Sequence, residues 1–137
     1  MITRDAISEA DLERALELAP PDIRPFVLLA GWAGLRCREI AELRATDLLW
    51  TGEPAIMVRV GNEQSSVSMS PWLVDQLHSC EFPVQGYLFA AGDGRVPADA
   101  IACIGGQYLR SLGINATMHH LRNRFLILEW RAIRGSQ

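Results

Sequence analysis

The chain has 137 residues, of which 49% are hydrophobic and 21% charged, and its formal net charge at pH 7 is −3. This length fits one domain with a sizeable apolar core, and the longest apolar run, residues 26–33, is too short to span a membrane. The acidic balance is unusual for a free-standing nucleic-acid-binding protein, which normally carries a basic surplus. All 13 basic residues are arginine, so no mechanism on this chain can use a lysine ammonium.

Hydrophobic periodicity and turn residues predict a mostly helical chain with one small hairpin. Ser8 has the position of a helix N-cap, Gly34 ends or bends a long apolar helix, and the pair Ser70-Pro71 begins another. We therefore expect an α+β fold that is mostly α. The predicted elements are helices over residues 8–18, 22–34 and 37–44, hairpin strands over 55–60 and 66–69, a helix over 70–79, a short buried strand over 86–89, a helix over 97–113, and a last helix capped by Thr117.

The N-terminus and the cysteines both predict a soluble cytoplasmic protein. Residues 1–9 carry charges of both signs and no apolar segment of the kind found in signal peptides. The three cysteines, Cys37, Cys80 and Cys103, are odd in number and widely spaced, which fits a reducing compartment. The histidines and cysteines have no CxxC or HxxxH spacing that supports a zinc site, so we expect no metal or other cofactor.

The segment "AGLRCREIAELRATDL", residues 33–48, places Arg36 directly after a Gly-Leu break and before an amphipathic turn. At a helix start that faces a cleft, the planar guanidinium suits a phosphate. The alternative is that Arg36 pairs with Glu39 or Glu42 on the helix surface. This segment alone leaves both interpretations open.

The segment "MHHLRNRF", residues 118–125, places His119 and Arg122 on one face of a helix, because residues three apart are neighbours there. Arg122 can bind a phosphate oxygen, and His119 can donate a hydrogen bond or transfer a proton. An ordinary solvated or capping helix face is the alternative for this segment taken alone.

In their order and spacing, these motifs resemble the catalytic domain of the tyrosine recombinases, the phage-integrase family. The resemblance covers the chain nearly end to end, and it implies a helical core with a small β-hairpin. It places Arg36 and Arg122 at the two catalytic arginines, His119 at the catalytic histidine, and Glu39 at the glutamate that follows the first arginine. The segments that carry it are "ISEADLERALELAP", "AGLRCREIAELRATDL", "SMSPWLVDQL", "GYLF" through "YLRSLGINAT", and "HHLR".

The resemblance implies a site-specific DNA recombinase that acts in DNA integration. In that family a tyrosine attacks a DNA phosphate, while two arginines and a histidine neutralise charge on the non-bridging oxygens. A hairpin lysine protonates the leaving 5′-hydroxyl. We therefore expect double-stranded DNA as the partner, a phosphate site made by the three matched residues, and further DNA contacts from Arg44, Arg59 and Arg124.

The chain departs from the family pattern at two places. Val60 stands at the usual position of the hairpin lysine, and no tyrosine follows Arg122. Tyr87 is predicted to pack in the core with its hydroxyl hydrogen-bonded, and Tyr108 lies in the helix before the motif. We therefore predict that residues 1–137 form a single domain without the tyrosine-bearing segment, that the chain binds DNA weakly alone, and that it does not cleave DNA.

Three further expectations concern partners and rival functions. A domain without its final helices exposes apolar surface, which predicts self-association or contact with missing parent-protein segments. A non-catalytic DNA-binding module would use a basic face and bind in a salt-sensitive, sequence-tolerant way. A degenerate mobile-element remnant would act only through protein contacts, which the lack of hairpin charge favours. The basic face would comprise Arg36, Arg122, Arg124, Arg131 and Arg134.

Overall fold

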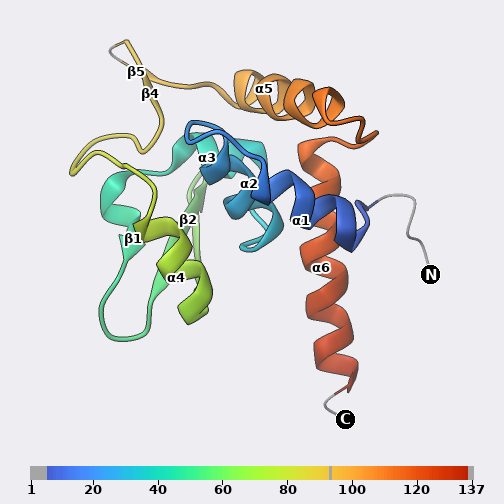
Figure 1. Ribbon diagram of the computed structural model, residues 1–137. Coiled ribbons are helices and arrows are strands. Elements are labelled where there is room, and N and C mark those ends of the chain that lie inside the picture. Colours follow the sequence, from blue (N-terminus) through green and yellow to red (C-terminus); the bar gives the residue numbers. More distant parts are fainter. Residues whose placement is uncertain (1–5, 93, 136–137) are drawn as a thin grey trace.

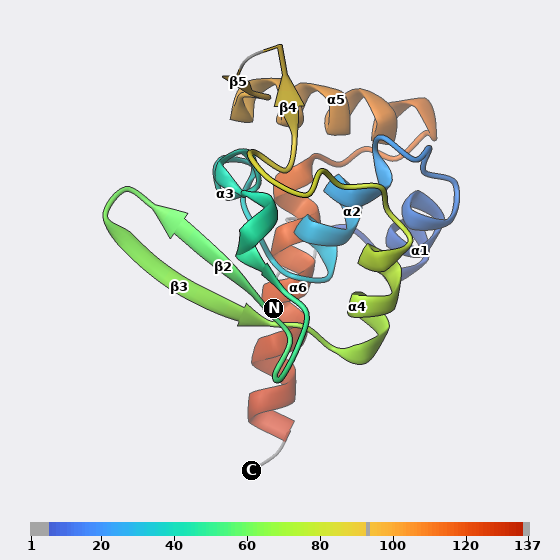
Figure 2. The same ribbon diagram turned by 90° about the vertical axis from the view of Figure 1, so that its left-hand side faces the viewer.

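A computed structural model of the chain describes residues 6–92 and 94–135, without the side chains of Val60 and of residues 133–135. Helices surround the central helix α2, and the β2–β3 hairpin projects from them (Figures 1 and 2). This confirms the predicted α+β, mostly α, class. The elements are α1 (Glu9–Glu17), α2 (Arg24–Gly31), α3 (Cys37–Glu42), the 3₁₀ helix η1 (Ala45–Asp47), β1 (Leu48–Leu49), β2 (Ala55–Val60), β3 (Glu63–Ser68), α4 (Pro71–His78), β4 (Ala90–Ala91), β5 (Gly94–Arg95), α5 (Ala98–Ser111) and α6 (Met118–Gly135).

Two predicted helix starts are confirmed by their capping hydrogen bonds. The Ser8 hydroxyl accepts the backbone N–H of Asp11 at 3.1 Å at the start of α1. The Ser70 hydroxyl accepts the backbone N–H of Leu73 at 3.1 Å, and Pro71 occupies the first position of α4. Each cap gives a partner to a backbone donor that a helix cannot satisfy internally.

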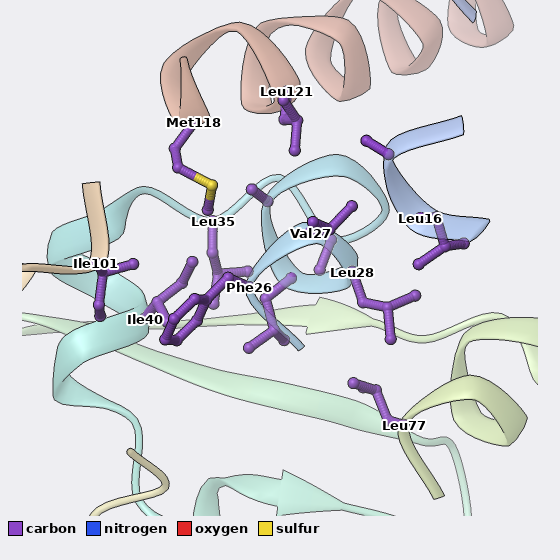
Figure 3. Packing of buried hydrophobic residues seen from close by; sticks show 14 of the residues in the cluster. Leu16, Phe26, Val27, Leu28, Leu35, Ile40, Leu77, Ile101, Met118 and Leu121 are labelled. Atoms are coloured by element: carbon purple, nitrogen blue, oxygen red, sulfur yellow. The ribbon is translucent and has the colours of Figure 1, made fainter. Parts of the chain in front are cut away.

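The apolar core gathers around α2, in which every residue from Pro25 to Gly31 is buried. Figure 3 shows Met118 and Leu121 of α6 on one side of the α2 residues Val27 and Leu28, with Leu77 of α4 on another side. Burying a leucine side chain contributes about 1.5–3 kcal/mol. The predicted central position of this helix is therefore correct.

The hairpin strands form an antiparallel sheet in the order β1-β2-β3. Val60 pairs with Glu63, so the turn contains only Gly61 and Asn62, and β3 begins three residues earlier than the predicted strand at residue 66. The prediction placed polar residues in the turn. A glycine with φ of 61° at Gly61 instead closes a two-residue turn, and the polar residues continue the exposed strand.

The predicted strand over residues 86–89 is wrong. Tyr87 makes one isolated β-bridge with Arg44, and Leu88 is the buried residue of this segment. The backbone N–H of Leu88 donates to the Leu43 carbonyl at 2.8 Å, which ties the segment to the end of α3. The next residues pair elsewhere, since β4 and β5 form a separate two-stranded sheet.

The outer part of α6 exposes apolar side chains. Leu126, Leu128 and Trp130 are 41%, 43% and 59% exposed, and Figures 1 and 2 show this end of α6 extending beyond the other elements. Such a surface is consistent with the predicted self-association, which stays a prediction. No helix in the described part of the chain combines the length and apolar character needed to cross a bilayer.

A buried hydrogen bond joins α5 to α1, and its removal is expected to destabilise the protein. The Tyr108 hydroxyl donates to the Ala15 carbonyl at 2.7 Å. Ala15 lies in the last turn of α1, where carbonyls lack regular intrahelical partners. Tyr108→Phe is expected to lower the free energy of unfolding at pH 7 by about 1–2 kcal/mol. Urea denaturation measures this, and Tyr87→Phe, at a partly exposed tyrosine, is the control.

The same bond predicts an alkaline dependence of stability. Burial raises the pKa of Tyr108 above its usual value of about 10. As the pH rises past 10, the unfolded chain therefore loses this proton before the folded protein does, and stability falls until the raised pKa is passed. Tyr108→Phe is expected to remove that part of the alkaline decline. An unchanged decline in this variant would contradict the assignment.

Candidate functional site

A cavity of about 580 Å³ lies between α3, α5 and the start of α6. It brings together Arg36, His119 and Arg122, the three residues that the motifs predict to act on one phosphate. No aspartate or glutamate is among its described lining residues, so the lining itself is positively charged. Its lining comprises Arg36, Cys37, Ala102, Cys103, Gly106, Arg110, Thr117, Met118, His119 and Arg122.

Arg36 is placed by the break between α2 and α3. Gly34 has a φ of 73°, which turns the chain out of the end of α2. Arg36 is the N-cap residue of α3, and its backbone N–H donates to the Glu39 carboxylate at 2.7 Å. Glu39 therefore caps the helix, while Glu42 forms an ion pair with Arg95 at 3.1 Å. The alternative surface ion pair of Arg36 with either glutamate is absent among the described residues.

Arg122 is anchored through one edge of its guanidinium. Its Nε donates to the Gly34 carbonyl at 3.1 Å, which joins α6 to the loop that carries Arg36. Burial lowers the pKa of Arg122, the neighbouring Arg36 lowers it further, and Glu39 partly offsets both effects. The guanidinium stays charged at neutral pH but lies near a like charge. A bound anion would relieve that repulsion.

The two adjacent histidines have different positions. His119 is exposed and lines the cavity. The His120 Nδ1 atom accepts the Thr117 backbone N–H at 2.9 Å and lies 3.0 Å from the Thr117 hydroxyl. Thr117 was predicted to cap the helix with its own side chain. The structure instead has the His120 imidazole accepting the backbone N–H of Thr117. This leaves His119 as the histidine available to a ligand.

The other predicted DNA-contacting arginines lie outside the cavity lining. Arg59 forms an ion pair with the buried Asp47. Arg44 donates to the Tyr87 hydroxyl at 3.2 Å and lies over that ring at 4.3 Å. Tyr87 therefore has the predicted hydrogen bond but is only partly buried.

Arg124 is partly buried, and its Nε atom has no hydrogen-bond partner among the described residues. Arg131 is exposed on α6. The side chains of Arg134 and Val60 lie outside the described residues, so the structure says nothing of the basic face at Arg134 or of the lysine position at Val60. DNA contacts by Arg44, Arg59 and Arg124 stay predictions.

Arg110 is a charged residue of the cavity lining that the motifs did not indicate. It lies on α5 four residues after Gly106, which itself follows Ala102 by four. This spacing places all three on one helix face. The sequence pattern that could have indicated Arg110 is therefore two small residues followed by an arginine, each four residues apart. Two thiols also line the cavity. Burial raises the pKa of Cys37, which disfavours its reactive thiolate form.

No family model and no curated protein sequence matches the chain. Solved structures do match. The integrase from mycobacterium phage Brujita has a TM-score of 0.77 at 24% identity, over 88% of this chain and 42% of that chain. The XerA recombinase has a TM-score of 0.74 at 24% identity, over 88% of this chain and 48% of that chain.

The chain has the fold of the tyrosine recombinases, the family whose motifs it resembles. It spans less than half the length of the two matched recombinase chains. The likeness confirms the predicted fold and covers most of this chain. It concerns backbone arrangement, and the chemistry of the cavity has to be argued from the residues themselves.

Proposed function

We propose that this chain belongs to a site-specific DNA recombinase, and that its cavity binds a DNA phosphate. The observation that supports this is the meeting of Arg36, His119 and Arg122 in one cavity, although they come from distant parts of the sequence. The same three residues match the arginine and histidine positions of the tyrosine-recombinase motifs. The recombinase fold supports the same conclusion.

The chemistry of the lining suits a phosphodiester. The guanidiniums of Arg36 and Arg122 offer charged, planar donors to non-bridging oxygens. His119 adds a ring nitrogen that can donate a hydrogen bond to a further oxygen. Since burial and the neighbouring Arg36 both lower the pKa of Arg122, an anion in the cavity stabilises the charged form of that guanidinium. The site is therefore better prepared for an anion than for a neutral or cationic ligand.

The described lining of the cavity contains no tyrosine that could attack a bound phosphate. Neither Tyr87 nor Tyr108 lines the cavity. The Tyr108 hydroxyl is engaged with Ala15, and the Tyr87 hydroxyl accepts from Arg44. The sequence also has no lysine to protonate a leaving 5′-hydroxyl. We therefore propose that this chain binds DNA and does not cleave it alone.

Binding to duplex DNA at several salt concentrations tests the proposal. Arg36→Ala and Arg122→Ala are each expected to weaken binding about ten- to a hundredfold, because each removes charged hydrogen bonds. Fluorescence anisotropy measures the affinity, and circular dichroism confirms that the variants fold. Arg14→Ala is the control, because Arg14 is an exposed arginine on α1 outside the cavity lining. Equal affinities for all four proteins would contradict the proposal.

A non-catalytic DNA-binding module is the second candidate, favoured by the lack of a tyrosine in the cavity lining. Both functions predict the binding losses above, and both predict that this chain does not cleave DNA, so a nicked suicide substrate tests the prediction that they share. The protein is incubated with this DNA, and covalent adducts are sought on a denaturing gel. An adduct formed by this chain would contradict both the module and our prediction that it does not cleave DNA.

A further inference from the structure

Arg110 contributes a third guanidinium to the cavity, from a different element than the other two. Arg36 begins α3 and Arg122 lies on α6, whereas Arg110 lies near the end of α5. All three line the same cavity. The pKa of Arg122 responds to Arg36 and Glu39, which places those charges in its immediate surroundings. Arg110 therefore adds positive charge from a separate wall.

The position of Gly106 shows how the Arg110 side chain lies. A Cβ atom added at Gly106 would be 3.2 Å from Arg110 Nη1 and 3.8 Å from Nη2. The guanidinium therefore folds back by one turn over the bare backbone of a cavity-lining glycine. A basic residue near a helix end commonly stabilises the C-terminal carbonyls. Arg110 points away from that end, so the helix dipole does not explain its position.

The Arg110 guanidinium is also without a protein partner in the described part of the chain. It makes no hydrogen bond or ion pair there, unlike Arg59 and Arg95, which pair with carboxylates. Glu39, the acidic group that acts on Arg122, already accepts the Arg36 backbone N–H. Arg110 is thus an exposed residue that lines the cavity without a carboxylate partner among the described residues.

The charge of the cavity exceeds what one phosphodiester supplies. Each DNA phosphodiester carries a single negative charge, whereas three guanidiniums line this space. Arg36 and Arg122 lie near each other and suffice for one phosphate. We propose that Arg110, seated over Gly106, binds a second phosphate of the same DNA strand, next to the first. This inference rests on the proposed DNA-phosphate function.

The salt dependence of DNA binding tests the second contact. Each phosphate contact contributes about 0.9 to the slope of log K against log salt concentration. Arg110→Gln is expected to reduce the slope by about 0.9 and the affinity about tenfold, in the wild-type protein and equally in the Arg36→Ala variant. The matched control is Arg14→Gln, which removes the same charge outside the cavity lining.

Gly106→Ala tests whether the Arg110 guanidinium has to lie over Gly106. The added methyl is close only to the flexible end of Arg110, so the variant is expected to fold with an unchanged or higher unfolding midpoint. It is expected to weaken DNA binding in the wild-type background and to have no effect when Arg110 is already glutamine. An equal loss in both backgrounds would overturn the seating of Arg110 by Gly106.

The remaining outcomes separate this inference from the function on which it rests. If Arg110→Gln binds like the wild type while Arg36→Ala is weak, the second contact is wrong and the proposed function stands. If the Arg110→Gln effect disappears in the Arg36→Ala background, both arginines act on one phosphate, which overturns the second site. If neither Arg36→Ala nor Arg122→Ala changes binding, the proposed function itself fails.

Discussion

Gly34→Ala is expected to lower the free energy of unfolding by about 2–5 kcal/mol and to disrupt the cavity. Gly34 has a φ of 73°, where a residue with a Cβ atom costs about 1–2 kcal/mol. The new Cβ would also lie 2.3 Å from Phe125 Cδ2 and 2.7 Å from Cε2. Relieving that overlap has to move α6 or the α2–α3 loop, and overpacking costs about 1–3 kcal/mol.

The same substitution reaches the cavity because the Gly34 carbonyl accepts the Arg122 Nε hydrogen bond. A shift of this carbonyl weakens the hydrogen bond that holds the Arg122 guanidinium. The affinity for DNA is therefore expected to fall together with the free energy of unfolding. Urea denaturation and anisotropy measure the two effects separately. Gly52→Ala is the matched control, since Gly52 has a φ of 72° and nothing within 4 Å of an added Cβ.

The difference between the two glycine variants isolates the steric overlap. Gly52→Ala is expected to lower the free energy of unfolding by about 1–2 kcal/mol, which is the cost of the backbone conformation alone. The double variant Gly34→Ala/Phe125→Ala is expected to show coupling, because removing the Phe125 ring removes the overlap. Equal losses for Gly34→Ala and Gly52→Ala would show that contact with Phe125 does not govern this position.

Arg59→Ala is expected to lower the free energy of unfolding by about 2–3 kcal/mol. Asp47 is 1% exposed, and its carboxylate accepts the Arg44 backbone N–H at 2.9 Å and a bond from the Arg59 guanidinium. Removing one partner of a buried ion pair costs about 3–5 kcal/mol. The expected loss is smaller here because the Arg59 side chain is 44% exposed and Asp47 keeps its backbone donor.

Arg95→Ala is the matched control for the Arg59 variant. It breaks the pair with Glu42, in which the two side chains are 44% and 39% exposed, and is expected to cost under about 1 kcal/mol. Adding Asp47→Asn to Arg59→Ala is expected to recover part of the stability by removing the buried charge. Urea denaturation measures all variants. A loss for Arg59→Ala no greater than for Arg95→Ala would refute a structural role for Arg59.

Much of the fold was predictable because its signals are local. The Ser8 and Ser70 caps, the apolar run of α2 and the hairpin strand β2 each depend on a few neighbouring residues. The shared helix face of His119 and Arg122 follows from the helical period alone. Residues 86–89 were mispredicted because a short apolar segment fits a strand equally well as a loop that buries one side chain.

Local sequence patterns are enough to predict the helical class, the central helix and the two motifs that carry Arg36, His119 and Arg122. Which distant groups surround Arg36, Arg59, Arg110 and Arg122 depends on how the helices pack. Packing of α3, α5 and α6 places Arg36 and Arg122 in one cavity and adds Arg110 to it, whereas it directs Arg59 to a buried carboxylate. The physical reason is that caps and periodicity depend on near neighbours, while charge pairing depends on which distant segments the core brings together.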